Sequence, residues 1–377
     1  LHLSLRRQRQ MCIRDRLYYG GEYYFLGSDF EPYLNDLYLV INIFNVLFVS
    51  AFLLGVKTSK IRRVERVERR VTSSFLLLYA APLFLYAALR LSLLSESGNA
   101  LLNLLMILFN SLIPIIGYAL LKSVRFSRIF LLGFVLLAIF FGFRYRIVLL
   151  LLPLALYFFV LHSYSLRNRI ILASSIIGGI FLIAVVGVTR EYSTGLTLSR
   201  LDSLSIGDVL IHGVFNDTST ALVSGAVIDQ IRVSENYAGF AQLYYVFSYF
   251  VPSSFFENKE YSPIFSFVSQ VTGQYSNQSG AAVLGFVEYY HTAGYFGVAL
   301  FALVLSITLA RLYKSAVYGD SYEVFFYLVI VTWFINSLTR GYLPQNFQDL
   351  ISLCIGLRLI KMKISSSSFR IFPARTI

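Results

Sequence analysis

Long apolar segments follow one another along nearly the whole chain, separated mostly by short stretches that carry arginine and lysine. A helix that crosses the hydrocarbon core of a bilayer needs about 20 mostly apolar residues, each adding about 1.5 Å of rise. Only 14% of the 377 residues are charged, whereas a soluble globular domain carries about 25%. We therefore expect an all-α, polytopic membrane protein in which residues 17–377 form a single membrane domain.

Nine segments are apolar enough to be spanning helices, the shorter ones with the help of flanking residues. They are Leu37–Gly55, Ser74–Leu94, Ala100–Leu121, Ile129–Phe143, Ile147–Leu161, Ile170–Val188, Tyr295–Tyr313, Val324–Leu338 and Phe347–Ile360. The fourth and fifth segments are separated only by Arg144, Tyr145 and Arg146. One helix over both segments would be far longer than the bilayer core is thick, so we expect a tight hairpin at these three residues.

The basic residues between the segments are unequally distributed. Lysine and arginine concentrate in alternate loops, beginning with the loop after Val56 and ending with the C-terminal tail. Short cytoplasmic loops carry an excess of these residues, so the pattern predicts a cytoplasmic C-terminus. With nine spans, residues 17–36 then lie outside, and they contain no lysine or arginine. The same distribution accounts for the net charge of +12 without a nucleic-acid partner.

Residues 1–16 read LHLSLRRQRQMCIRDR and differ from the remainder of the chain. They lack the apolar core and the small-residue cleavage site of a signal peptide. They resemble sequencing-adapter sequence translated as protein, so we expect an artefact that takes no part in the fold. We also expect native N-terminal sequence, with one helix or more, to be missing before residue 17. The two cysteines, Cys12 and Cys354, predict neither a disulfide framework nor a metal site.

Residues 189–294 form the one long segment between spans, after the sixth and before the seventh, on the side predicted to face outward. Within it, Tyr237–Val251 is aromatic and apolar, and we interpret it as a re-entrant or interfacial helix or another membrane element. Irregular backbone at membrane depth must be buried in protein or line a wet cavity. We therefore expect the segment to cover a cavity that opens to the exterior.

Three stretches of the chain resemble a known family. Gly142–Val160 places arginines in a short outer loop before a helix. Ser279–Phe301 combines a small-residue loop, an acidic residue, an aromatic pair and a Gly-aromatic-Gly lead into the next helix, and Arg340–Asn346 (RGYLPQN) precedes the last span. These stretches resemble the Wzy-type O-antigen polymerases, the oligosaccharide repeat-unit polymerases of bacterial inner membranes. The family pattern often has asparagine where His291 stands.

The resemblance implies a multi-pass glycosyltransferase that works at the outer face of the bacterial inner membrane. Such an enzyme moves the growing glycan from undecaprenyl diphosphate onto a hydroxyl group of the next lipid-linked repeat unit. Its expected partners are the undecaprenyl-diphosphate-linked oligosaccharide, the lipid bilayer, a chain-length regulator and a flippase. The outer segment has no DxD-like or clustered-carboxylate motif, so we expect a metal-independent reaction that needs no cofactor.

Four arginines are candidates for binding the diphosphate, because all lie at the predicted outer boundary of the membrane: Arg144, Arg146, Arg190 and Arg340. A lipid diphosphate is a leaving group that needs positive charge more than it needs a proton. Arginine is permanently charged and can donate two parallel hydrogen bonds to phosphate. The alternative for each arginine is a contact with lipid headgroups or a role in ending a helix.

Glu288 and His291 are the candidate catalytic residues, since the acceptor hydroxyl group needs a base or a hydrogen-bonding partner. They are three residues apart just before the seventh span, so on a helix they share a face. The alternatives are that Glu288 pairs with an arginine in a structural role and that His291 is an ordinary interface residue.

Two other functions compete with the polymerase. A ligase of the O-antigen type would transfer glycan to a lipid A core by similar chemistry, and composition does not separate it from a polymerase. A polysaccharide transporter or flippase often has inverted repeats and helices broken near the middle of the membrane. The sequence has no convincing repeat, and Gly178-Gly179 is the single interruption of this kind that we find.

Overall fold

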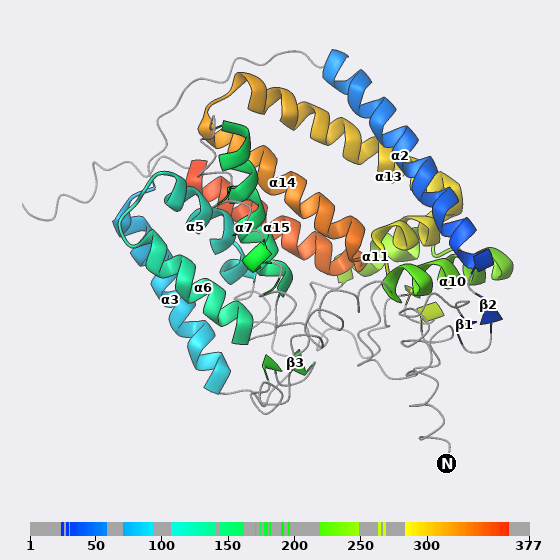
Figure 1. Cartoon of the computed structure of the whole chain (residues 1–377), viewed down its shortest axis with the longest axis horizontal. Helices are drawn as coiled ribbons and strands as arrows, with labels where there is room; N and C mark the ends of the chain where they lie inside the picture. Colours follow the sequence, from blue (N-terminus) through cyan, green and yellow to red (C-terminus); the bar gives the residue numbers. More distant parts are fainter. Residues whose placement is uncertain are drawn as a thin grey trace, which may run out of the picture.

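The computed structural model describes a set of ranges separated by gaps: residues 24–25, 28–29, 31–58, 71–92, 107–140, 144–161, 170, 174, 177–179, 181, 190–191, 195–196, 219–248, 263–264, 267–268 and 283–361. Residues 1–16 and most of the sixth predicted span lie outside these residues. Within the described ranges the chain is mostly helical (Figure 1).

The helices are α2 (Glu31–Thr58), α3 (Ser73–Ser92), α5 (Leu112–Leu121), α6 (Ser127–Phe140), α7 (Arg144–Leu161), α10 (Ser219–Ser234), α11 (Phe240–Ser248), α13 (Gly285–Tyr318), α14 (Ser321–Thr339) and α15 (Leu343–Lys361). Four two-residue strands form two antiparallel pairs, β1 (Tyr24–Phe25) with β2 (Ser28–Asp29) and β3 (Arg190–Glu191) with β4 (Gly195–Leu196). Helices therefore coincide with eight of the nine predicted spans.

Three helices in the described part of the chain are long and apolar enough to cross a membrane, at Tyr33–Thr58, Gly285–Tyr318 and Ser321–Thr339. Shorter apolar helices lie at Ile107–Leu121, Ser127–Ile139 and Tyr145–Phe159. Large apolar side chains point outward from these helices, such as Leu53, which is 63% exposed, and Phe296, which is 72% exposed. A helical protein embedded in a membrane accounts for such an apolar exterior.

The helices pack through close contacts at small residues and aromatic rings. α2 lies against α13, α13 against α14, and α14 against α7 and α15, while α3 and α6 pair on the other side of the molecule (Figure 1). A Cβ atom on Gly55 of α2 would lie 2.9 Å from the Cβ atom of Ala310 of α13. Small residues allow such close approach where lipid surrounds the helices and packing drives their association.

One end of the molecule collects the helix ends that carry lysine and arginine. Tyr118 of α5 meets Tyr322 of α14 edge to face at 5.7 Å. The hydroxyl group of Tyr322 donates a hydrogen bond to the carbonyl oxygen of Leu357 of α15 at 2.7 Å. The last turns of α2 and α15 contain basic residues, among them Lys57 and Lys361. The predicted cytoplasmic loops begin at these helix ends.

Part of the long segment 189–294 belongs to the helical core. The residues of α10 from Leu222 to Ile228 are buried, and α10 packs against α2 and α13. A Cβ atom on Gly225 would lie 2.7 Å from the carbonyl oxygen of Tyr33, so only glycine fits this helix crossing. The α11 helix lies inside the aromatic stretch that the sequence singled out, and it contacts α15 (Figure 1).

Candidate functional site

Three segments that are distant in sequence meet at the start of α15, and we call this meeting point the α15 junction. The backbone N–H of Gly341 donates to the carbonyl oxygen of Val283 at 2.6 Å. The backbone N–H of Leu343 donates to Oε1 of Glu288 at 3.4 Å. The side chain of Gln345 donates from Nε2 to the hydroxyl oxygen of Tyr145 at 2.7 Å. The three segments are those that carry the family resemblance.

Two glycines permit this close approach of backbone to backbone. A Cβ atom on Gly285 would lie 2.2 Å from the carbonyl oxygen of Ser337, and one on Gly341 would lie 2.6 Å from the carbonyl oxygen of Leu284. Side-chain carbons cannot approach a carbonyl oxygen so closely. The α15 junction therefore requires glycine at position 285 in one segment and at position 341 in another.

Glu288 joins three helices at the α15 junction. It lies in the first turn of α13 and is only 1% exposed. Its Oε1 atom accepts the hydrogen bond from Leu343 of α15, and its Oε2 atom accepts one from Nε2 of Gln242 in α11. Among the described residues its hydrogen-bond partners are thus an amide and a backbone N–H. The alternative role, pairing with an arginine, is not among these contacts.

His291 lies one helical turn after Glu288 and is equally buried. Its ring meets the ring of Phe267 edge to face, with 5.2 Å between the centroids. Its Nδ1 atom has no hydrogen-bond partner among the residues that the structure describes. The two predicted catalytic residues are therefore buried on the same short stretch of helix but have different neighbours.

A break in α13 separates this short stretch from the remainder of the helix. Ala293 and Gly294 have non-helical backbone angles, and Gly294 has φ 59° and ψ −143°, a conformation that is essentially reserved for glycine. A Cβ atom on Gly297 would lie 2.3 Å from the carbonyl oxygen of Tyr289. The first glycine of the Gly-aromatic-Gly motif supplies the bend and the second supplies space for it.

The chain that leads into α11 satisfies backbone groups at the break. The N–H groups of Ala238 and Gly239 donate to the carbonyl oxygens of His291 and Thr292 at 2.9 and 2.8 Å. A break in a helix leaves such carbonyls without their usual partners within the helix. These bonds hold the start of α11 against the turn of α13 that carries His291.

Arg146, one of the four predicted diphosphate-binding arginines, is buried, at 6% exposed. Its guanidinium carbon lies 5.5 Å from the centroid of the Tyr145 ring, and the residue interacts electrostatically with Asp349 of α15. Asn110 donates from Nδ2 to Oδ1 of Asp349 at 3.4 Å. Through Tyr145 and its bond to Gln345, Arg146 belongs to the surroundings of the α15 junction.

The other three predicted arginines lie at the ends of secondary-structure elements. Arg340 caps the C-terminus of α14, and its carbonyl oxygen accepts a hydrogen bond from Nδ2 of Asn346 at 2.8 Å. Arg144 begins α7 and Arg190 begins β3, but their side chains lie outside the described part of the structure. The expected hairpin residues 144–146 form the first turn of α7, because α6 already ends at Phe140.

Sequence reasoning missed Gln242, Tyr145 and Asp349. The carboxylate of Asp349 is 4% exposed and lies within the last predicted span. An ionisable residue inside an apolar span is itself a signal for function, and this signal could have identified Asp349. Gln242 had no such signal, because only the folding of α11 against α13 brings it to Glu288.

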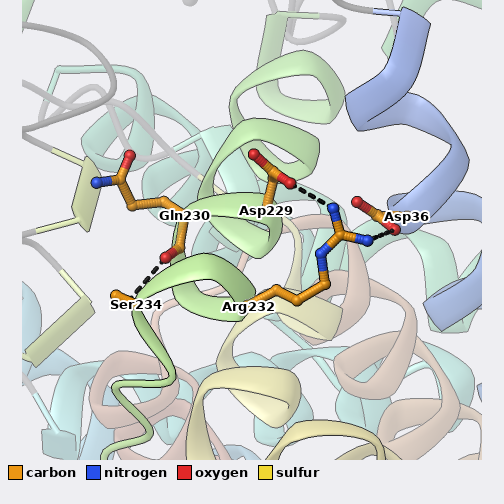
Figure 2. A network of polar contacts seen from close by, with 5 residues as sticks. All are labelled: Asp36, Asp229, Gln230, Arg232 and Ser234. Carbon is orange, nitrogen blue, oxygen red and sulfur yellow. Dashed lines mark hydrogen bonds and ion pairs between the residues drawn. The ribbon is translucent and has the colours of Figure 1, made fainter.

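A second network of polar side chains joins α2 and α10 (Figure 2). Arg232 donates from Nη1 to Asp36 at 2.9 Å and from Nη2 to Asp229 at 2.7 Å. Hydrogen bonding to Asp229 raises the pKa of Arg232, so the guanidinium stays charged. Its side chain is 50% exposed. This network lies at the surface, apart from the buried residues of the α15 junction.

These features define a helical membrane protein with buried polar side chains at a junction of helix ends. No protein-family model matches the chain, and neither a curated protein nor a solved structure is found to match it. Within the described ranges, no three His, Cys, Asp or Glu side chains are grouped so that they could hold a metal ion.

Proposed function

We propose that this protein is a membrane glycosyltransferase that polymerises undecaprenyl-diphosphate-linked oligosaccharide repeat units. The observation that carries the proposal is the α15 junction, where the three family-like segments meet through hydrogen bonds from Gly341, Leu343 and Gln345. Segments that independently resemble one enzyme family would be expected to converge if they share an active site. The proposal includes nine spans in a bacterial inner membrane, a periplasmic segment 189–294 and a cytoplasmic C-terminus.

In the proposed reaction, a hydroxyl oxygen of the incoming repeat unit bonds to the anomeric carbon of the growing glycan. The bond from that carbon to the diphosphate oxygen breaks, and its electron pair leaves with the lipid diphosphate. The hydroxyl proton passes to a base. The family resemblance implies inversion at the anomeric carbon.

Arginine supplies the positive charge that the departing diphosphate needs. Arg146 is the leading candidate, because a buried guanidinium acts in surroundings that screen its charge less than water does. Arg144, Arg190 and Arg340 are proposed to contribute from the same predicted boundary of the membrane. Preorganised charge of this kind stabilises a leaving group without a metal ion.

Of the two predicted catalytic residues, His291 is the better candidate for the base. Both carboxylate oxygens of Glu288 already accept hydrogen bonds, from Gln242 and Leu343. In contrast, Nδ1 of His291 is buried and has no hydrogen-bond partner among the described residues. In this scheme Glu288 holds the helices of the site in position and His291 accepts the proton.

A transporter is the alternative function that one observation favours, because α13 is interrupted and transporters often contain broken helices. In transporters such breaks lie near the middle of the membrane. Here the break follows the first eight residues of a helix of 34 residues. Its position near a helix end agrees better with a transferase site at the membrane surface.

The decisive experiment is reconstitution of the protein with a short synthetic undecaprenyl-diphosphate oligosaccharide in lipid vesicles. We expect products that grow by whole repeat units and lipid diphosphate released in equal amount. Transfer to a lipid A core acceptor alone would identify a ligase. Movement of the lipid-linked oligosaccharide across the vesicle membrane without any transfer would identify a flippase.

A further inference from the structure

Two buried polar atoms near Glu288 lack hydrogen-bond partners among the described residues. They are Oε1 of Gln242, whose residue is 0% exposed, and Nδ1 of His291, whose residue is 1% exposed. Buried polar groups in folded proteins nearly always have a partner, and those without one in the protein are commonly satisfied by water or by a ligand. Both atoms are therefore expected to meet a polar group that comes from outside the protein chain.

The two atoms belong to the same contact between α11 and α13. Gln242 donates to Glu288, which lies one turn before His291. The backbone N–H groups of Ala238 and Gly239 bond to the carbonyl oxygens at and after His291. Gln242 and the two residues that precede α11 thus contact the turn of α13 that carries both Glu288 and His291.

Glu288 decides which end of the Gln242 amide is left open. The amide nitrogen Nε2 of Gln242 donates to Oε2 of Glu288, so the amide oxygen faces elsewhere. The open group at Gln242 is consequently an acceptor, and it needs a donor. A phosphate or carboxylate would bring only acceptors next to Glu288, whereas two neighbouring hydroxyl groups of a saccharide can donate, one to Oε1 of Gln242 and the other to Nδ1 of His291.

We propose that Gln242 and His291 bind neighbouring hydroxyl groups of a saccharide, one at each residue, and that Glu288 orients Gln242 for this contact. The identification of the hydroxyl group at His291 as the one that attacks in glycan transfer rests on the proposed function. The saccharide site itself rests only on the buried atoms of α11 and α13. Gln242 becomes a substrate-binding residue and Glu288 a positioning residue.

Cysteine labelling tests the site without an assay of transfer. Gln242→Cys and, separately, His291→Cys are made in full-length protein in which Cys12 and Cys354 are alanine, and the protein is reconstituted in vesicles. A small, charged, water-soluble methanethiosulfonate is added on the side opposite the C-terminus. The matched control is Val246→Cys, which replaces another buried side chain of α11, 4% exposed.

We expect both site cysteines to be labelled and Val246→Cys to be labelled much more slowly. Free glucose, galactose, mannose or N-acetylglucosamine should slow labelling at the site, whereas glycine betaine, which has no hydroxyl group, should not. His291→Cys leaves the bond between Gln242 and Glu288 in place, so it reports even if Gln242→Cys folds poorly. Equal labelling of all three positions, no labelling of either site position, or no sugar with any effect would overturn the proposal.

Kinetics of Gln242→Met separate this proposal from the proposed function. Methionine keeps the side-chain length but cannot bond to a hydroxyl group, so the KM for the acceptor saccharide should rise by roughly three- to tenfold while that for the lipid-diphosphate donor stays unchanged. If the variant forms polymer with an unchanged acceptor KM, the saccharide site is disproved while the polymerase function stands. If sugars block the labelling but the protein transfers no glycan, the saccharide site stands while the polymerase function is disproved.

Discussion

The glycines at the α15 junction matter because they let two backbone segments approach each other closely. Gly285 and Gly341 let two chain segments approach until a carbonyl oxygen occupies the space of a side chain. Glu288 then uses its two oxygens to bind a backbone N–H and an amide from two other helices. Small residues and one carboxylate therefore do the joining here, in a protein whose remaining core is mostly aliphatic and aromatic.

Replacement of Gly285 by alanine should destabilise the protein. The new methyl group would lie 2.2 Å from the carbonyl oxygen of Ser337, and overpacking of this kind costs about 1–3 kcal/mol or more. The midpoint of thermal unfolding in detergent, followed by size-exclusion chromatography, measures the change. Gly178→Ala is the control, since nothing lies within 4 Å of the added atom, and equal midpoints for the two variants would contradict the packing described.

Replacement of Arg146 by lysine should impair polymer formation although the positive charge is kept. Lysine cannot donate the paired hydrogen bonds of a guanidinium, and loss of one charge-assisted hydrogen bond corresponds to roughly a tenfold to hundredfold lower rate. The rate of polymer formation in vesicles measures the effect. Arg232→Lys is the matched control at an exposed arginine, and full activity of Arg146→Lys would eliminate a diphosphate contact at this position.

Among the helices, α13 contributes most to the site because it is interrupted. Its first part carries Glu288 and His291, and its second part has the length and apolar surface of a spanning helix. The bend at Gly294 lets the first part turn away from the direction of the span. In an unbroken helix, the carbonyl oxygens of His291 and Thr292 would accept hydrogen bonds from residues four positions later and would not be open to the N–H groups of Ala238 and Gly239.

Replacement of Gly294 by alanine tests the break. An L-residue with φ near +59° is strained, typically by about 1–2 kcal/mol. We expect the thermal midpoint to fall and the chain before α11 to separate from α13, which faster cysteine labelling at position 291 reports. Ala293→Gly is the adjacent control, because its φ of −160° is ordinary extended backbone. Unaltered stability of Gly294→Ala would mean that the bend does not depend on this glycine.

The contact of α10 with α2 should depend on apolar packing more than on the ion pair of Figure 2. Asp36→Asn should change the free energy of unfolding by less than about 1 kcal/mol, because the partner Arg232 is half exposed and screened by water and salt. Ile228→Ala removes a fully buried side chain and should cost about 2–5 kcal/mol. Denaturation of the two variants at low and high salt compares them, and a larger loss from Asp36→Asn would reverse this ranking.

At the scale of the whole molecule, the polar residues are divided between two ends of an apolar bundle. The junction of α11, α13 and α15 occupies one end. The last turn of α15, with Lys361, lies at the other end of that helix, beyond the place where α5, α14 and α15 meet through Tyr322.

Labelling from outside intact cells should distinguish the two ends. Glu235 lies in the turn between α10 and α11 and is exposed, as are Arg125 between α5 and α6 and Lys361 at the end of α15. In a protein without its native cysteines, Glu235→Cys should react with an impermeant maleimide from outside. Arg125→Cys and Lys361→Cys should react only after permeabilisation, and reaction of all three from the same side would disprove the proposed orientation.

The sequence by itself determined the class of protein, because apolar runs of spanning length and few charges leave no soluble fold open to this chain. It also located most helices, since a run of apolar residues specifies its own hydrogen bonding in a membrane. It proposed Glu288 and His291 as catalytic residues and four arginines as diphosphate-binding residues, and these roles stay predictions: Arg144, Arg146, Arg190 and Arg340. It did not foresee that segment 189–294 contributes the buried helix α10 to the core.

Only the tertiary structure decided which residues meet. The bond from Gln242 to Glu288 depends on how α11 packs along α13, and the contact of Tyr145 with Gln345 joins two distant parts of the chain. Pairings of this kind leave no period or motif in a linear sequence, because they are set by helix crossing and by the bend at Gly294. The chemistry of single residues is readable from the sequence, whereas their assembly into a site is a property of packing.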